Sequence, residues 1–230
     1  MINNIITLFQ HNSGYYDLIA KFFAILTFLV LIMPLQEWAH ALTAYLMSDK
    51  TEKIDTKGWY NPFNYIDGIG ALSFFILGIG WSKSIPIGNL KPKKPKLSLV
   101  VVSLAGPVCY FVFAVITGII YFALTQFCSD MASTVFGDIF LRYAKNLVSL
   151  NAMLCALNLF PIPPLDMSKI WFLILPEKAA FFVNRCYPVF MFLLVMSLLF
   201  DVLALPVTYV STRILQAALY VAQLPFLLFI

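Results

Sequence analysis

The stretch PLQEWAHALTAYLM (residues 34–47) carries a glutamate and a histidine inside an otherwise apolar segment. Glu37 and His40 lie three residues apart, and Gln36 lies four residues before His40. On a helix, positions four apart share one face, so Gln36 and His40 would lie one above the other with Glu37 alongside. Ionisable side chains inside a membrane span are costly and mark functional sites by default. The meaning of this stretch therefore depends on whether a membrane surrounds it.

The composition of the whole chain indicates a membrane protein. Of its 230 residues, 61% are hydrophobic and 11% are charged. Soluble domains carry roughly 25% charged residues, so we predict a multi-pass integral membrane protein embedded in the lipid bilayer. The formal net charge of +4 is too small to indicate a nucleic-acid partner. The four cysteines form no CxxC pair, which favours apolar packing residues over a disulfide or metal framework.

Long apolar stretches with few charged residues predict the membrane spans, because about 20 apolar residues cross the hydrocarbon core as a helix and charges there are costly. The predicted spans are residues 16–47, residues 97–129, a segment from about 146 to 165, and two more helices within 186–230. With the short apolar run at 68–82, the expected fold is an all-α polytopic membrane protein with five to six transmembrane helices. The chain is expected to form a single membrane domain.

The run at 68–82 leaves two topologies open. Fifteen helical residues rise about 22 Å, which is less than the roughly 30 Å hydrocarbon core. Glycines at both ends of the run fit a short re-entrant segment, and a short tilted span fits equally well. The basic cluster KPKKPK (residues 91–96) is expected on the cytoplasmic side, because lysines beside spans are retained there.

Within the predicted span, QEWAH has the spacing of a zinc-binding helix. In the motif HExxH, two histidines four residues apart hold zinc, and the glutamate acts as general base toward the activated water. Here Gln36 replaces the first histidine, so the string reads QExxH. Such short strings also occur by chance, and this one gains its weight from its position in a predicted span.

A second polar position lies in NLFPIPPLDM (residues 158–167). Its three prolines prevent a helix from continuing, so the chain is expected to kink or unwind there. Unwound backbone at membrane depth is tolerated only where it lines a cavity or packs against protein. From the residues alone, Asp166 is either a third metal ligand or a surface residue where a helix ends in water.

Five segments of the chain, taken in order, resemble the motifs of one family. They are QEWAHALTAYLMSD, NPFNYIDGIG, GWSKSIPIGN, SLAGPVCY and NLFPIPPLDM. Over about residues 30–170 they are similar to HExxH, NPxxHIDPxG, a Trp-containing segment before a PxPxN-like turn, AGPxxN and NxxPxxxLDG. The chain thus resembles a short bacterial member of the site-2 protease family, which are intramembrane zinc metallopeptidases.

The resemblance implies roles for individual residues. Glu37 matches the general base, whereas His40 and Asp166 match zinc ligands. Asn151 and Asn158 match polar positions on the helix that faces the site. The family's substrates are transmembrane segments of other proteins, cut within or near the bilayer.

The resemblance also implies an organisation and a location. The family core would cover about residues 16–175, with additional C-terminal helices at about 186–230. Strand-like backbone within residues 54–64, after the first helix, would help to present the substrate. The expected location is a bacterial cytoplasmic membrane.

The family pattern breaks at four positions: Gln36, Tyr65, Tyr110 and Met167. Gln36 matters most, because it stands where the first histidine ligand is expected. The chain's other histidine, His11, lies about 37 Å from Gln36 along a helix and cannot replace it. A neutral amide oxygen suits hard cations better than zinc, so Gln36 is expected to be a weak or lost ligand. Zinc binding should be correspondingly weaker.

Two principal functions therefore remain open. The first is an intramembrane metallopeptidase with a weakened metal site, cleaving transmembrane segments by metal-activated water. The second is a catalytically inactive relative, a pseudoprotease, that binds and regulates transmembrane client proteins. Transport or scaffolding is a further alternative, in which Glu37, His40 and Asp166 would form a polar pathway.

Overall fold

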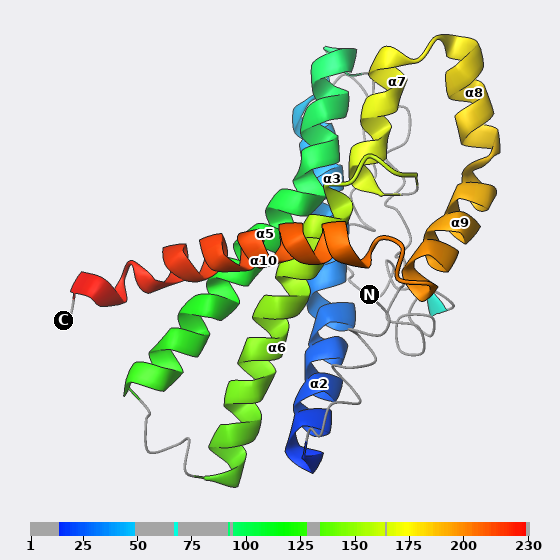
Figure 1. Ribbon diagram of the computed structural model, residues 1–230. Helices are drawn as coiled ribbons and strands as arrows, with labels where there is room; N and C mark the ends of the chain where they lie inside the picture. The colour runs from blue at the N-terminus through cyan, green and yellow to red at the C-terminus, as the bar shows by residue number, and fades with distance from the viewer. Residues whose placement is uncertain are drawn as a thin grey trace.

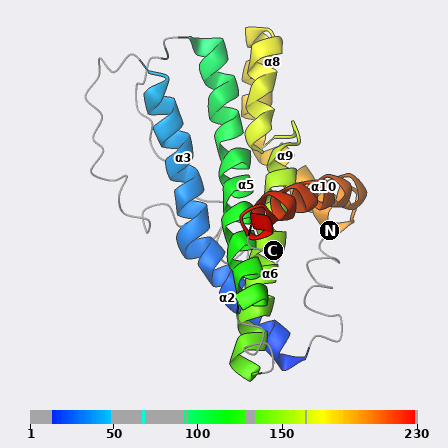
Figure 2. The same cartoon turned by 90° about the vertical axis from the view of Figure 1, so that its left-hand side faces the viewer.

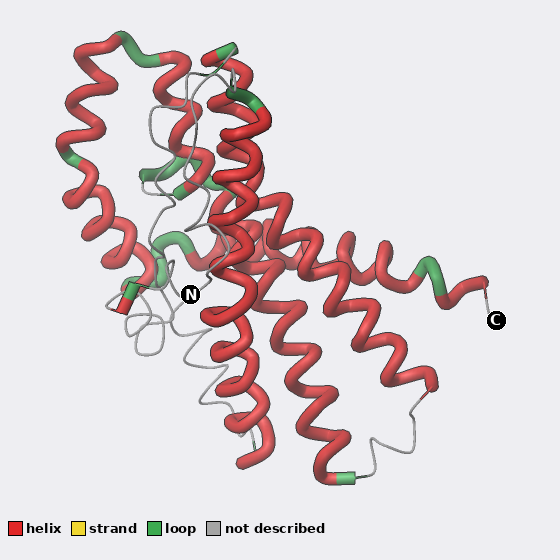
Figure 3. The backbone as a smooth tube through the Cα atoms, turned by 180° about the vertical axis from the view of Figure 1, so that it is seen from behind, coloured by secondary structure: helices red, strands yellow, loops and turns green. Residues whose placement is uncertain are grey.

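The computed structural model describes residues 14–48, 67–68, 92, 94–127, 134–163 and 165–228. Within these ranges the chain forms helices and turns without a strand, as Figure 3 shows, and Ser48 and Pro92 form an isolated antiparallel bridge. The prediction of an all-helical fold is confirmed for these residues. The expected strand-like backbone at 54–64 and nearly all of the run at 68–82 lie outside the described residues, as does Tyr65.

The first long helix contains the segment that opens the sequence analysis. It runs from Tyr15 to Leu46 over 32 residues and consists of α2 (Tyr15–Thr27), the π-helical turn η1 (Phe28–Ile32) and α3 (Met33–Leu46). In the wide turn, the Met33 N–H donates to the Phe28 carbonyl five residues back. Proline inside a helix lacks an N–H and collides with the preceding turn. The wide turn directly before Pro34 therefore lets the helix continue into α3.

The second long helix, α5 (Pro95–Phe127), contains 33 residues and rises about 50 Å. Pro107 lies inside it, and apolar residues dominate its length. Tyr15–Leu46 and Pro95–Phe127 are both long and apolar enough to cross a membrane. They match the spans predicted at residues 16–47 and 97–129, while the count of five to six spans stays a prediction.

The central helix α6 (Val135–Asn158) packs against α2, α5 and α10 (Ala204–Gln223). Figures 1 and 2 show α2, α5 and α6 running roughly alongside one another. The helix begins earlier than the predicted start near Asn146. Thr134 caps it by accepting a hydrogen bond from the Gly137 N–H, and the exposed Arg142 pairs with Asp138 one turn earlier. The charged residues before Asn146, such as Asp138 and Arg142, thus belong to a continuous helix.

The C-terminal part differs from the sequence-based expectation in one element. Residues 177–185 carry Glu177, Lys178 and Arg185 and were not expected to be helical, yet they form the short helix α8 (Glu177–Arg185). It follows η5 (Asp166–Ile170), a 3-10 helix, and α7 (Trp171–Ile174), and precedes α9 (Tyr187–Leu199). Its charged residues sit beside phenylalanines in an amphipathic pattern, which residue charge alone does not distinguish from a loop. The two helices expected after residue 186 are present as α9 and α10, and η6 (Phe226–Leu228) follows them.

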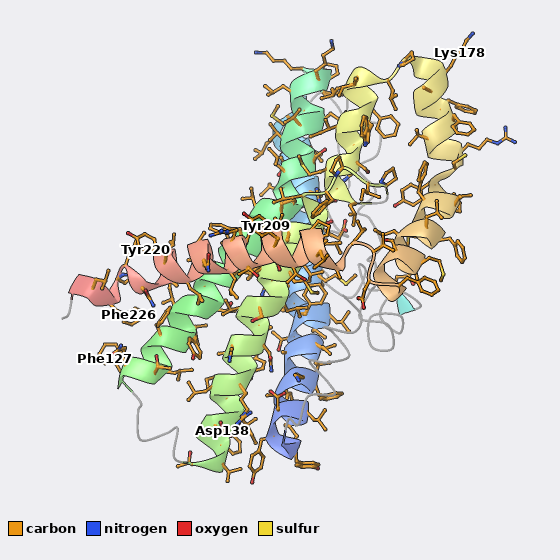
Figure 4. All side chains as sticks on the ribbon, in the orientation of Figure 1. Phe127, Asp138, Lys178, Tyr209, Tyr220 and Phe226 are labelled. Carbon is orange, nitrogen blue, oxygen red and sulfur yellow. The ribbon has the colours of Figure 1, made fainter. Side chains whose placement is uncertain are left out.

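Helix α10 crosses α5 and α6 at a steep angle (Figure 1). Small residues allow the close approach to α5, because Ala218 and Ala222 are fully buried and an added Cβ at Gly118 would lie 2.9 Å from the Ala222 Cβ. Close contact through small residues is the usual way in which helices pack in lipid. Phe127 and Phe226 meet farther along, with ring centroids 6.1 Å apart, as labelled in Figure 4.

Candidate functional site

Three polar side chains from two distant segments converge beside α5. Gln36 and His40 lie one turn apart on the buried face of α3, with 5% and 6% of their surfaces exposed. The Nε2 atom of His40 lies 3.1 Å from Oδ2 of Asp166, at the start of η5. The Gln36 side-chain amide donates to the same oxygen over 3.3 Å, across 130 residues of sequence. The structure thus brings together the three residues that the sequence analysis assigned to the metal site.

Asp166 reaches the site because α6 ends where the prolines begin. The helix terminates at Asn158, and the chain passes through turns before η5 starts at Asp166, so the predicted break is confirmed. The turn is held in place by the Trp171 indole N–H, which donates to the Pro161 carbonyl at 2.6 Å. Leu165, buried in an apolar cluster with Leu157 and Val207, anchors the residue before the carboxylate. Both η5 and α3 pack against α5. This arrangement places Asp166 next to Gln36 of α3.

The second ring nitrogen of His40 fixes the orientation of the first. Nδ1 lies 2.8 Å from the carbonyl oxygen of Val102 on α5. A carbonyl can only accept, so Nδ1 carries the proton and donates it to Val102. In neutral His40, Nε2 then presents a lone pair to Asp166. Such anchoring of one ring nitrogen is typical of histidines that ligate a metal through the other.

The close contact between His40 and Asp166 is not a hydrogen bond. Nε2 is buried and has no hydrogen-bond partner among the described residues, although Oδ2 of Asp166 is 3.1 Å away. With Nδ1 protonated, a neutral His40 and an ionised Asp166 would face each other with two lone pairs. Two acceptors at this distance repel each other, and a cation bound between them would remove that repulsion.

The spacing of these two atoms fits one zinc ion. Atoms bound to zinc at about 2.1 Å and at the tetrahedral angle lie about 3.4 Å apart, close to the 3.1 Å between His40 Nε2 and Asp166 Oδ2. The described part of the chain contains no group of three or more His, Cys, Asp or Glu side chains that could hold a metal. The third donor would be Gln36, whose amide must turn over to present Oε1, because its NH₂ now donates to Asp166.

Lys169 is a part of the site that the sequence analysis missed. Its Nζ lies 3.4 Å from Oδ1 of Asp166, three residues earlier on η5. The Lys169 side chain is 39% exposed, whereas that of Asp166 is 13% exposed. Lys169 thus brings a positive charge to the outer oxygen of the carboxylate. The i, i+3 spacing was a visible signal, but it has meaning only once residues 166–170 are known to be helical.

The remaining predicted site residues are Glu37 on α3 and the two asparagines Asn151 and Asn158 on α6. Glu37 is half-buried on α3, between Gln36 and His40. Asn151 is fully buried, and its Nδ2 donates to the Leu147 carbonyl. Asn158 donates in the same way to a carbonyl four residues back. Each asparagine therefore uses one of its two amide N–H donors within α6 itself.

The departures at Tyr110 and Met167 differ in their consequences. Tyr110 is buried one turn after Gly106 and stacks on Phe28, with ring centroids 6.1 Å apart. It therefore packs into the apolar core cluster that also contains Leu147 of α6. Met167 replaces a glycine of the family pattern, but Asp201 is the sole non-glycine residue with positive φ in the described ranges. The backbone at Met167 is thus open to a side chain, and this departure carries no strain.

Comparison with known proteins supports the family assignment in its broader form. The chain is 31% identical over 156 residues to the Bacillus subtilis (strain 168) protein described as "Putative zinc metalloprotease YwhC", and the match covers 68% of this chain and 70% of that protein. No protein-family model matches the chain, and no solved structure matches it. The extent of the identity shows that the chain belongs to the same zinc metalloprotease family as the Bacillus subtilis protein.

Proposed function

We propose that this protein is an intramembrane metallopeptidase of the site-2 type, with a metal site weakened by Gln36. The observation that carries the proposal is the 3.1 Å approach of His40 Nε2 to Asp166 Oδ2, with the His40 ring oriented by Val102. The relative from Bacillus subtilis supports zinc as the metal. His40 and Asp166 would hold it, with the Gln36 amide oxygen as the weak third donor.

The chemistry follows from the arrangement of these groups. A bound zinc ion would polarise the scissile carbonyl and lower the pKa of a water molecule to about 7. Glu37, on the same helix as His40, would accept a proton from the attacking water and deliver it to the leaving amine. The amide bond is thereby hydrolysed to a carboxylic acid and an amine, without a covalent intermediate on the protein.

A membrane setting is supported by the surface of the molecule. Large apolar side chains are exposed along several helices, including Phe136 and Leu205 at 84% each. Such a surface is unfavourable in water and suited to lipid. Asp138 and Lys178, labelled in Figure 4, lie toward opposite ends of the bundle. We infer that the bundle spans the bacterial cytoplasmic membrane and that its substrates are transmembrane segments of other proteins.

The second candidate is a non-catalytic relative that binds transmembrane segments and regulates them. One observation favours it: Asp166 already has protein partners on both oxygens, namely Gln36 on Oδ2 and Lys169 on Oδ1. A carboxylate that is neutralised in this way is stable without a metal ion. The client-binding surface would then be retained while hydrolysis is lost.

Metal content and cleavage separate the two candidates. Wild-type protein, purified in detergent after expression with added zinc, is analysed for bound metal by mass spectrometry and for cleavage of a transmembrane peptide. The peptidase proposal expects substoichiometric zinc and slow cleavage that the His40→Ala variant loses. Absence of both metal and cleavage in the wild type, with retained binding of the peptide, would instead support the non-catalytic candidate.

Lys169 provides a further prediction about zinc affinity. The Lys169→Gln variant is expected to bind zinc about 10-fold more tightly, because a positive charge next to Asp166 repels a divalent cation. The matched control is Lys169→Arg, which keeps the charge and should bind zinc like the wild type. Competition with a chromophoric chelator measures the affinities. Weaker binding in Lys169→Gln would contradict repulsion and show that Lys169 mainly positions the carboxylate.

A further inference from the structure

The floor of the site is formed by one turn of α5. Val102 supplies the carbonyl that orients His40, and Gly106 lies one turn farther along the same helix. A Cβ atom added at Gly106 would lie 2.1 Å from Oδ2 of Asp166, 2.8 Å from Nε2 of His40 and 3.0 Å from Nε2 of Gln36. The missing side chain of Gly106 therefore gives the Asp166 carboxylate room to lie against α5, next to His40 and Gln36.

We propose that Gly106 is a positioning residue of the metal site, because a residue without a Cβ at this point of α5 lets the Asp166 carboxylate lie beside His40. This inference rests on the proposed metal site. The Asp166 Oδ2 atom lies where a Cβ of residue 106 would collide with it, and the polar atoms of His40 and Gln36 border the same point. An alanine methyl group there would displace the Asp166 carboxylate from His40 while leaving every candidate ligand in the chain.

The stability of the metal-free protein provides a test that needs no metal. Alanine normally stabilises a helix relative to glycine. At position 106, however, the methyl group would lie closer to Asp166 Oδ2 than real Cβ atoms approach another heavy atom. We therefore expect Gly106→Ala to lower the unfolding temperature, and we expect Asp166→Ala to restore much of the loss when combined with it. Additive effects of the two substitutions would overturn the placement of Gly106 against Asp166.

Metal affinity tests the second part of the inference. Gly106→Ala is introduced into the Gln36→His background, which has the stronger ligand set, and zinc affinity is measured by chelator competition. We expect affinity to fall by about 100-fold or more, beyond what the loss of an outer-shell contact usually costs. Gly118→Ala is the matched control on the same helix, because its new Cβ also meets a neighbour closely, at 2.9 Å from the Ala222 Cβ. This control should keep zinc affinity unchanged.

The outcomes distinguish this inference from the proposed function. If Gln36→His binds zinc and Gly106→Ala does not reduce that affinity, the inference is wrong and the metal site stands. If Gln36→His binds no zinc at all, the metal site itself is refuted. If Gly106→Ala does not fold, the double variant with Asp166→Ala decides, since recovery of folding supports the steric placement and continued misfolding contradicts it.

Discussion

The Gln36→His variant is expected to bind zinc about 100-fold or more tightly than the wild type. Loss of an outer-shell partner typically costs 10–100-fold in metal affinity, so replacing a poor ligand by an imidazole should have at least the upper end of that effect. Gln36 is buried, one turn before His40, and its side chain already reaches Asp166. A histidine there would place a second imidazole on the same face of α3 without changing the helix.

The measurement is zinc affinity by chelator competition, together with the zinc content of the purified protein. Leu46→His is the matched control, because it adds a histidine to the same helix at an exposed position and should not alter the affinity. An unchanged affinity in Gln36→His would mean that positions 36, 40 and 166 do not form a metal site. Tight, stoichiometric zinc in the wild type would instead show that Gln36 is an adequate ligand.

The second large effect concerns Glu37. In the Gln36→His background, Glu37→Gln is expected to reduce cleavage of a transmembrane peptide by about 100-fold or more, because general-base catalysis typically contributes 10²–10⁴-fold. Zinc affinity should stay the same, since Glu37 is proposed to act on the water and not as a ligand. Parallel measurement of zinc and of the cleavage rate therefore separates catalysis from metal binding.

Asp138→Asn is the control for the loss of a carboxylate. Asp138 is paired with Arg142 near the start of α6, away from α3, and its substitution should leave cleavage unchanged. Equal cleavage by the Gln36→His protein with and without Glu37 would refute the proposed base. If Gln36→His binds zinc but cleaves nothing, the non-catalytic candidate is favoured.

In the Gln36→His variant, zinc binding is expected to increase more readily than cleavage of a peptide substrate. The Gln36→His change repairs the ligand set, but it does not alter Tyr110, which is buried one turn beyond Gly106 and stacked on Phe28. An asparagine stands at this position in the family pattern, and the tyrosine fills the space with an aromatic ring. A metal ion needs only the donor atoms of residues 36, 40 and 166, whereas an extended peptide substrate needs more room.

The sequence by itself determined the features that depend on neighbouring residues. Long apolar stretches predicted the helices at Tyr15–Leu46 and Pro95–Phe127, because the length of an apolar run is a local property of the sequence. The spacing of Gln36 and His40 predicted their common face on α3. The prolines after Asn158 predicted the end of α6, since proline removes a backbone donor and blocks the preceding turn. The positions of charged residues gave wrong helix boundaries at the start of α6 and in α8, because amphipathic helices continue through charged residues.

Only the tertiary structure decided how these parts form a site. The sequence could not decide whether Asp166 contacts α3 or lies in water. A contact across 130 residues depends on how η5 and α3 both pack against α5. The same packing gave a role to the main-chain carbonyl of Val102, a group that every residue has, and to the missing side chain of Gly106. Neither has a signature in residue chemistry, since both acquire their meaning from the atoms that the fold brings next to them.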